Sequence, residues 1–311
     1  MIDVKGIIPA VITPMKDDKV LDYDAFDFYI KWVLEQGATG LAVNVDTGEG
    51  PTLTLDEKNR LLQIAEKRIG GSALLVAGII GSSTQRVLDE AKRAKDCGAD
   101  IGLVFPNTAF RGNPQNPEAL KDFYQEMSDY ADLDLMLFLL QDALGGIEFE
   151  EASLRKIARV ERLIAVKEAA FDISGFKKTM SLFRNLEEEY GKRISVLTGN
   201  DNFIFESFLW GCDGALIGAA AQDTKRMVEC YDACVARDWG RAVELSRKFQ
   251  PLVDAVFEKP VRDYRARTKA CLYLQGVIPN KIVRPPLIEV PDEELGYWRR
   301  LLTESGLEVV R

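Results

Sequence analysis

The stretch Leu163-Ile164-Ala165-Val166-Lys167-Glu168-Ala169-Ala170 begins with a continuous apolar run that ends at Lys167. A run without polar alternation, followed by a helical segment, is typical of a buried strand in a parallel sheet. Burying an ammonium group is costly, and desolvation lowers its pKa from about 10.4 toward neutrality. The neutral amine can then attack a carbonyl carbon and form a Schiff base. Taken alone, the stretch also fits a strand-end lysine that reaches into solvent. The rest of the sequence is needed to distinguish these two roles of Lys167.

Short apolar runs alternate with amphipathic segments from the N-terminus to about residue 237. The runs cover residues 7–12, 41–45, 74–79, 101–105, 133–140, 163–167, 194–197 and 215–217. This order predicts repeated βα units and a parallel sheet. About eight such units predict a (β/α)8 TIM barrel. A doubly wound open sheet is the second choice, because the sequence has no glycine-rich dinucleotide motif.

The strand pattern stops after about residue 237. Residues 239–257, 261–275 and 292–305 are predicted helices, with prolines in the loop between the last two. We therefore expect two regions: residues 1–237 form the barrel that carries the active site, and residues 238–311 form a C-terminal helical region.

Composition excludes several classes of function. The net charge of −9 comes without a basic stripe, which argues against a nucleic-acid surface. The strongest apolar run, residues 135–140, is too short for a bilayer, and the N-terminus does not resemble a signal peptide, so we expect a cytoplasmic protein. The sequence contains no histidine, which excludes a Ser-His-Asp triad, a Cys-His dyad and a histidine-ligated zinc ion.

Active residues of a parallel barrel lie where its strands end. After the second predicted strand comes Asp46-Thr47-Gly48-Glu49-Gly50, a tight turn whose N–H groups and hydroxyl can hold a carboxylate. Phe138 lies near the end of the fifth strand, Lys167 ends the sixth and Ile217 ends the eighth. The seventh strand ends in Leu197-Thr198-Gly199-Asn200-Asp201.

These strand ends resemble those of the Schiff-base superfamily of dihydrodipicolinate synthase and N-acetylneuraminate lyase, over nearly the whole chain. Gly6-Ile7-Ile8-Pro9-Ala10-Val11-Ile12-Thr13-Pro14 is similar to the opening strand, and Asp46-Thr47-Gly48-Glu49 to the G-T-T-G-E turn. Val166-Lys167-Glu168-Ala169 resembles the signature around the Schiff-base lysine, and residues 197–201 resemble the L-x-G-x-D segment. The resemblance implies a TIM barrel that assembles as a homotetramer or homodimer, and a catalytic role for Lys167.

The sequence also departs from that pattern. Phe138 stands where the family has a proton-shuttling tyrosine, and Asp46 stands for the first threonine of the turn. The synthase's interface tyrosine falls within residues 107–110, and its carboxylate-binding arginine falls at Ala143. Genuine dihydrodipicolinate synthase activity is therefore not expected.

The remaining residues still define a chemical site. We expect Thr47 and Gly48 to anchor a substrate carboxylate, and Phe138 and Ile217 to line the substrate site. Asp46 is the hypothetical replacement for the missing acid/base group, although it could instead pair with a nearby cation. Strand alternation points Glu168 away from the face that carries Lys167.

The sequence thus predicts a lyase that binds pyruvate or another 2-oxo acid as an imine on Lys167. The imine is the electron sink, so no metal or organic cofactor is expected. One alternative is a hydratase or dehydratase acting on a 2-oxo sugar acid. The other is a catalytically silent ligand-binding homologue.

Overall fold

Eight parallel strands form a ring at the centre of the computed structural model, which describes residues 2–311. The strands are β1 (Gly6–Pro9), β2 (Gly40–Val43), β3 (Leu74–Ile79), β4 (Ile101–Val104), β5 (Asp134–Leu140), β6 (Leu163–Ala169), β7 (Ser195–Thr198) and β8 (Gly214–Ile217). From β2 to β8 each strand pairs with its sequence neighbour, and β8 pairs with β1. The ring closes where Thr39 N–H donates to Ile7 O at 2.9 Å and Val11 N–H to Ala42 O at 3.1 Å. The predicted (β/α)8 barrel is confirmed.

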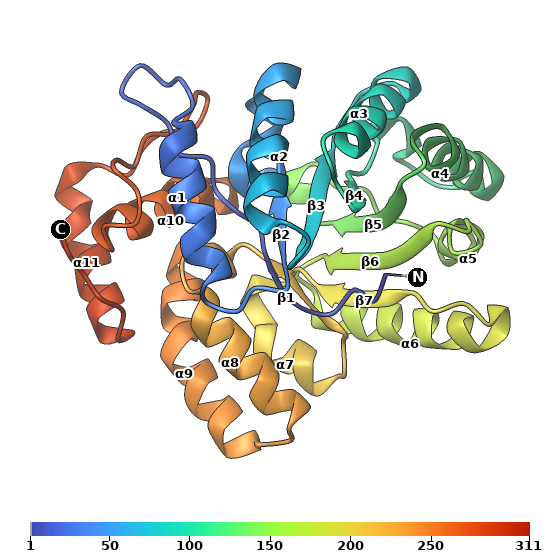
Figure 1. Ribbon diagram of the computed structural model, residues 1–311. Coiled ribbons are helices and arrows are strands. Elements are labelled where there is room, and N and C mark those ends of the chain that lie inside the picture. Colours follow the sequence, from blue (N-terminus) through green and yellow to red (C-terminus); the bar gives the residue numbers. More distant parts are fainter. Residues whose placement is uncertain (1) are drawn as a thin grey trace.

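Helices surround the ring of strands (Figure 1). The helices that alternate with the strands are α1 (Tyr23–Leu34), α2 (Leu55–Ile69), α3 (Thr84–Asp96), α4 (Pro117–Ala131), α5 (Glu151–Ile157), α6 (Ile173–Tyr190), α7 (Ile204–Leu209) and α8 (Thr224–Val235). Three more helices follow β8 and α8: α9 (Trp239–Val256), α10 (Tyr264–Leu274) and α11 (Leu295–Glu304). Within residues 2–311, none of the helices combines the length and apolar character that crossing a bilayer requires.

Two apolar layers share the side chains of the strands. Met136, Phe138 and Leu197 belong to the cluster inside the ring, whereas Leu137 and Val166 belong to the cluster between the strands and the helices. The alternation follows from strand geometry, which points successive side chains to opposite faces. It decides which strand-end residues reach the interior of the barrel.

The C-terminal helices pack as a third apolar cluster, and α10 is also fastened to the barrel. Lys269 of α10 forms an ion pair with Glu49, and both side chains are almost completely inaccessible to solvent. The other Glu49 carboxylate oxygen accepts the Arg284 N–H at 2.8 Å. Breaking one partner of such a buried pair costs about 3–5 kcal/mol, so α10 is held firmly against the turn after β2. The boundary at residue 237 stays a prediction.

Candidate active site

Lys167 lies inside the barrel on β6, between Phe138 of β5 and Leu197 of β7 in the strand register. Its side chain is buried, and Nζ lies 4.2 Å from the centre of the Phe138 ring. A cavity of about 30 Å³ opens beside it. Because one water needs at least about 10–15 Å³ of such space, the cavity has room for a few waters.

The cavity is lined by residues from the carboxyl ends of the strands and from the C-terminal helices. They are Val45, Asp46, Thr47, Phe138, Leu140, Leu144, Lys167, Ala169, Phe171, Gly199, Asp201, Gly218, Phe257 and Tyr264. The structure therefore brings four of the predicted residues together, namely Lys167, Asp46, Thr47 and Phe138.

Gly199, in the loop after β7, leaves the space that the Lys167 side chain occupies. A Cβ atom at this position would lie 2.5 Å from Lys167 Cε and 2.8 Å from Ala169 Cβ. Real Cβ atoms do not approach other carbons so closely, since interiors are already close-packed. The glycine of the L-x-G-x-D segment is thus required by the conformation of the lysine.

Burial and charge act on the Lys167 amine in opposite directions. Desolvation lowers the pKa of Lys167 to about 8, while the carboxylates of Asp201 and Asp46 favour its protonated form. Asp201 is itself buried, and desolvation raises its pKa to about 7, opposed by the Ala219 N–H, which donates to Oδ1 at 2.8 Å, and by Lys167. A substantial fraction of the lysine is therefore neutral near pH 7 to 8.

The turn after β2 presents Thr47 to the cavity but not Gly48. The N–H of Gly48 donates to Val45 O at 3.1 Å, and its carbonyl accepts the Thr13 hydroxyl at 2.8 Å. The predicted anchoring by the Gly48 N–H would therefore have to compete with the hydrogen bonds of the turn. The Thr47 hydroxyl donates to Tyr264 Oη at 3.2 Å, because the single Tyr264 proton is donated to Asp46. A substrate carboxylate would therefore have to replace Tyr264 as the acceptor.

Asp46 is held by two residues of the C-terminal region. Arg265 forms an ion pair with Oδ1, and its Nε donates to the Asp46 backbone carbonyl at 2.9 Å. Tyr264 donates its hydroxyl to Oδ2 at 2.9 Å. The alternative in which Asp46 pairs with a nearby cation thus describes its resting contacts, while its catalytic role stays a prediction.

Tyr264 and Phe257 also line the cavity, although neither was among the predicted site residues. Tyr264 is the first residue of α10, and its ring stacks on Phe257 with 4.8 Å between centroids. Gly218 allows this pair to approach the barrel, because a Cβ there would lie 2.9 Å from Phe257 Cζ. Asp201 was visible in the L-x-G-x-D segment, but no local signal marked the two aromatic residues as parts of the site.

Ile217 and Glu168 point away from this cavity. Ile217 packs in the layer between strands and helices, and its neighbour Gly218 lines the cavity instead. Ile217 therefore lies outside the cavity that it was predicted to line. Glu168 faces a hollow of about 520 Å³ on the helix side of the sheet, as strand alternation predicts. It accepts the Ala170 N–H at 3.1 Å and is bonded by the Asn200 amide.

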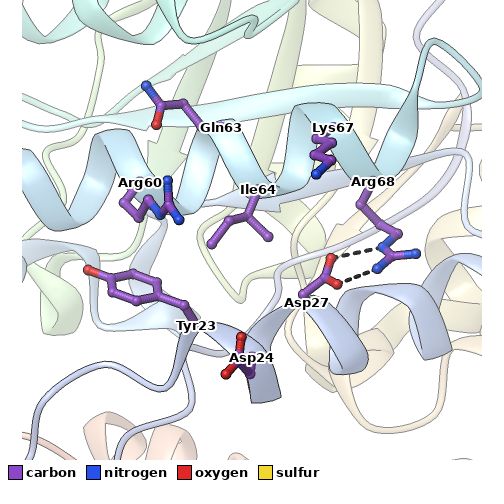
Figure 2. Close-up of a pocket in the computed structure, with 8 residues that line it drawn as sticks. All are labelled: Tyr23, Asp24, Asp27, Arg60, Gln63, Ile64, Lys67 and Arg68. Carbon is purple, nitrogen blue, oxygen red and sulfur yellow. Dashed lines mark hydrogen bonds and ion pairs between the residues drawn. The ribbon is translucent and has the colours of Figure 1, made fainter.

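A further hollow of about 430 Å³ lies on the outside of the barrel between α1 and α2. Figure 2 shows its mostly polar lining, in which the Asp27 carboxylate and the Arg68 guanidinium pair across the two helices. Because it lies outside the barrel between two helices and has no buried lysine like Lys167, it offers no comparable chemistry. Within residues 2–311, no group of three or more Cys, Asp or Glu side chains is arranged to hold a metal ion.

Fold and site together define a (β/α)8-barrel protein with a buried, partly neutral lysine at the carboxyl end of β6. The sequence matches the model of the dihydrodipicolinate synthetase family over residues 3–305. It is 29% identical over 303 residues to the 4-hydroxy-tetrahydrodipicolinate synthase of Thermotoga maritima, covering 97% of this chain and 99% of the relative. It is 28% identical over 305 residues to the synthase of Methanoculleus marisnigri, with 97% and 99% covered.

A solved structure of dihydrodipicolinate synthase from Thermotoga maritima superimposes with a TM-score of 0.88, at 27% identity, covering 99% of this chain and 100% of that one. The chain belongs to the dihydrodipicolinate synthetase family. This is a family of lyases, so the protein is assigned to the lyases.

Proposed function

We propose that the protein is a lyase that binds pyruvate or another 2-oxo acid as a Schiff base on Lys167. The proposal depends on the environment of the Lys167 amine. The amine is buried at the carboxyl end of a barrel strand, and desolvation lowers its pKa to about 8. A neutral amine can attack the keto carbon, expel water and form an iminium ion, which withdraws electrons from the adjacent carbon.

The groups around Lys167 support this chemistry. Burial in a lining that includes Leu140 and Leu144 disfavours the charged amine. The Phe138 ring, 4.2 Å from Nζ, acts in the opposite direction because an aromatic face attracts an ammonium group. The Thr47 hydroxyl lies on the wall of the same cavity and supplies the polar contact that a substrate carboxylate requires. The cavity is small, at about 30 Å³, so part of its lining must shift to admit a 2-oxo acid.

This chain lacks several residues that the resemblance leads us to expect in a dihydrodipicolinate synthase. Phe138 has no hydroxyl, and Ala143 has no charge where the resemblance expects an arginine. We therefore propose a different second substrate from that of the synthase. Residues 107–110, which include Phe110, do not supply the expected tyrosine.

Reductive trapping tests the proposal directly. Borohydride added to protein and pyruvate should give a covalent adduct that peptide mass spectrometry locates on Lys167. Lys167→Met should give none, while Lys177→Met, which removes an amine from the outer helix α6, should trap as the unmodified protein does. Absence of any adduct across a panel of 2-oxo acids would favour a ligand-binding protein. If trapping succeeds, product analysis then separates carbon–carbon bond cleavage from dehydration.

A further inference from the structure

We infer that Tyr264, delivered from α10, transfers the substrate's C3 proton between the Lys167 iminium and Asp46. This inference rests on the proposed Schiff-base function, because it concerns the step that follows imine formation. It assigns a role to a side chain that belongs to the C-terminal region and not to a barrel strand.

The position of the Tyr264 hydroxyl carries the argument. Tyr264 lines the same cavity as Lys167, and its side chain is 4% exposed. Its hydroxyl donates to Asp46 Oδ2 at 2.9 Å and lies 3.2 Å from Thr47 Oγ1. Thr47 and Tyr264 are the two residues with hydroxyl groups in the lining of this cavity. Since Phe138 has none, a phenolic proton can come only from the α10 side.

The neighbouring contacts hold this hydroxyl in one place. The Tyr264 ring stacks on Phe257 at an interplanar angle of 18°. The next residue, Arg265, is paired with Asp46, and Lys269 one turn further on is paired with Glu49. These ion pairs connect α10 with the turn that carries Asp46 and Thr47, so the hydrogen-bonded chain is fixed at both ends.

The proposed step balances charge and protons. The C3–H bond of the iminium breaks, its electron pair forms the C2=C3 bond, and the C=N π electrons neutralise the nitrogen. Tyr264 Oη accepts the proton while its own proton passes to Asp46 Oδ2. The products are a neutral enamine, a tyrosine hydroxyl and a protonated Asp46, and the reverse transfer returns the proton when a new bond forms at C3. The transfer neutralises the iminium and the Asp46 carboxylate together, and the Arg265 guanidinium, which pairs with that carboxylate in the resting state, keeps its hydrogen bond to the Asp46 backbone carbonyl at 2.9 Å.

The resting state suits this transfer. Burial raises the pKa of Tyr264 well above its ordinary value, with a further contribution from the Asp46 carboxylate. The phenol therefore stays protonated at neutral pH and serves as a conduit. Arg265 holds Oδ1 of Asp46, which leaves Oδ2 directed at the tyrosine.

Deuterium exchange tests the transfer separately from imine formation. In D₂O with pyruvate, the unmodified protein should replace the methyl protons with deuterium, as followed by NMR. Tyr264→Phe should still give the borohydride adduct on Lys167 but exchange about 10²- to 10⁴-fold more slowly, the usual contribution of a positioned acid/base group. Tyr273→Phe, a matched change further along α10, should exchange at the unmodified rate.

The outcomes separate this inference from the function on which it rests. If the unmodified protein forms no adduct, the proposed function fails. If it does, and Tyr264→Phe exchanges as fast as the unmodified protein, the inference alone is overturned. Should Tyr264→Phe fail to fold, Asp46→Asn decides. An adduct without exchange supports the transfer. Normal exchange overturns it, and so does loss of the adduct from folded Asp46→Asn, because Asp46 would then act in imine formation.

Discussion

Replacing Asp201 by asparagine should make Lys167 a better nucleophile at neutral pH. The carboxylates of Asp201 and Asp46 both raise the pKa of the Lys167 amine, and Asp201 has the larger effect. Asparagine has nearly the same shape, and its Oδ1 can still accept the Ala219 N–H that Asp201 accepts at 2.8 Å. The variant therefore removes, with little change in packing, the charge that Asp201 carries above its own pKa of about 7.

The size of the effect follows from the pKa of Lys167. With a pKa of about 8 in place of 10.5, the neutral fraction at pH 7 is about one tenth, about 300-fold more than for an exposed lysine. Removing an opposite charge from within about 4–6 Å shifts a pKa by about 1–3. Asp201→Asn should therefore lower the pKa of Lys167 further and make roughly half or more of the amine neutral at pH 7.

The assay is the amount of Lys167 adduct formed in a fixed short time with saturating pyruvate and cyanoborohydride, measured from pH 6 to 10. The unmodified protein should show a midpoint near pH 8. Asp201→Asn should move that midpoint down by about one pH unit or more and trap about 5-fold or more faster at pH 7. Asp129→Asn, an isosteric change on the exposed face of α4, is the control. A midpoint that stays in place or rises in Asp201→Asn would refute the reasoning.

Two further changes test how the site is held together. Gly199→Ala should lower the free energy of unfolding by about 1–3 kcal/mol and abolish trapping, because its Cβ would lie 2.5 Å from Lys167 Cε. Gly296→Ala is the control, since a Cβ there would have no atom within 4 Å. Equal effects of the two variants in thermal unfolding would contradict the reasoning. Glu49→Gln should cost about 3–5 kcal/mol in urea unfolding by leaving the Lys269 charge buried and unpaired. Adding Lys269→Met should recover part of that loss, and an additive double variant would show that the two side chains are not coupled.

The fold was predictable because the local periodicity of apolar residues indicates each strand and helix. Continuous apolar runs mark strands buried on both faces, and the predicted run at residues 74–79 coincides with β3 (Leu74–Ile79). The alternation of these runs with helices leaves few topologies, and the barrel is the one that closes about eight units. Strand alternation also placed Lys167 and Glu168 correctly on opposite faces of β6.

The strand-end residues were predictable only in part, since a motif does not say which way each side chain points. Lys167 and Thr47 line the cavity, as their motifs indicated. Ile217 was expected there because it ends β8, yet its parity on the strand puts it in the outer layer. Gly48 was expected to offer its N–H, yet the turn uses that group for its own hydrogen bond to Val45.

The C-terminal contribution could not be predicted, because it depends on a contact between residues 218 positions apart. Helical periodicity predicted a helix at residues 261–275, but nothing in that pattern says that its first turn meets the turn after β2. The structure shows a site whose β5 wall is apolar at Phe138 and whose hydroxyl groups lie at Thr47 and Tyr264. Arg265 and Lys269 fasten α10 to the turn after β2, so α10 helps to form the candidate site. Loosening these ion pairs should change the chemistry at Lys167 even where every barrel strand stays intact.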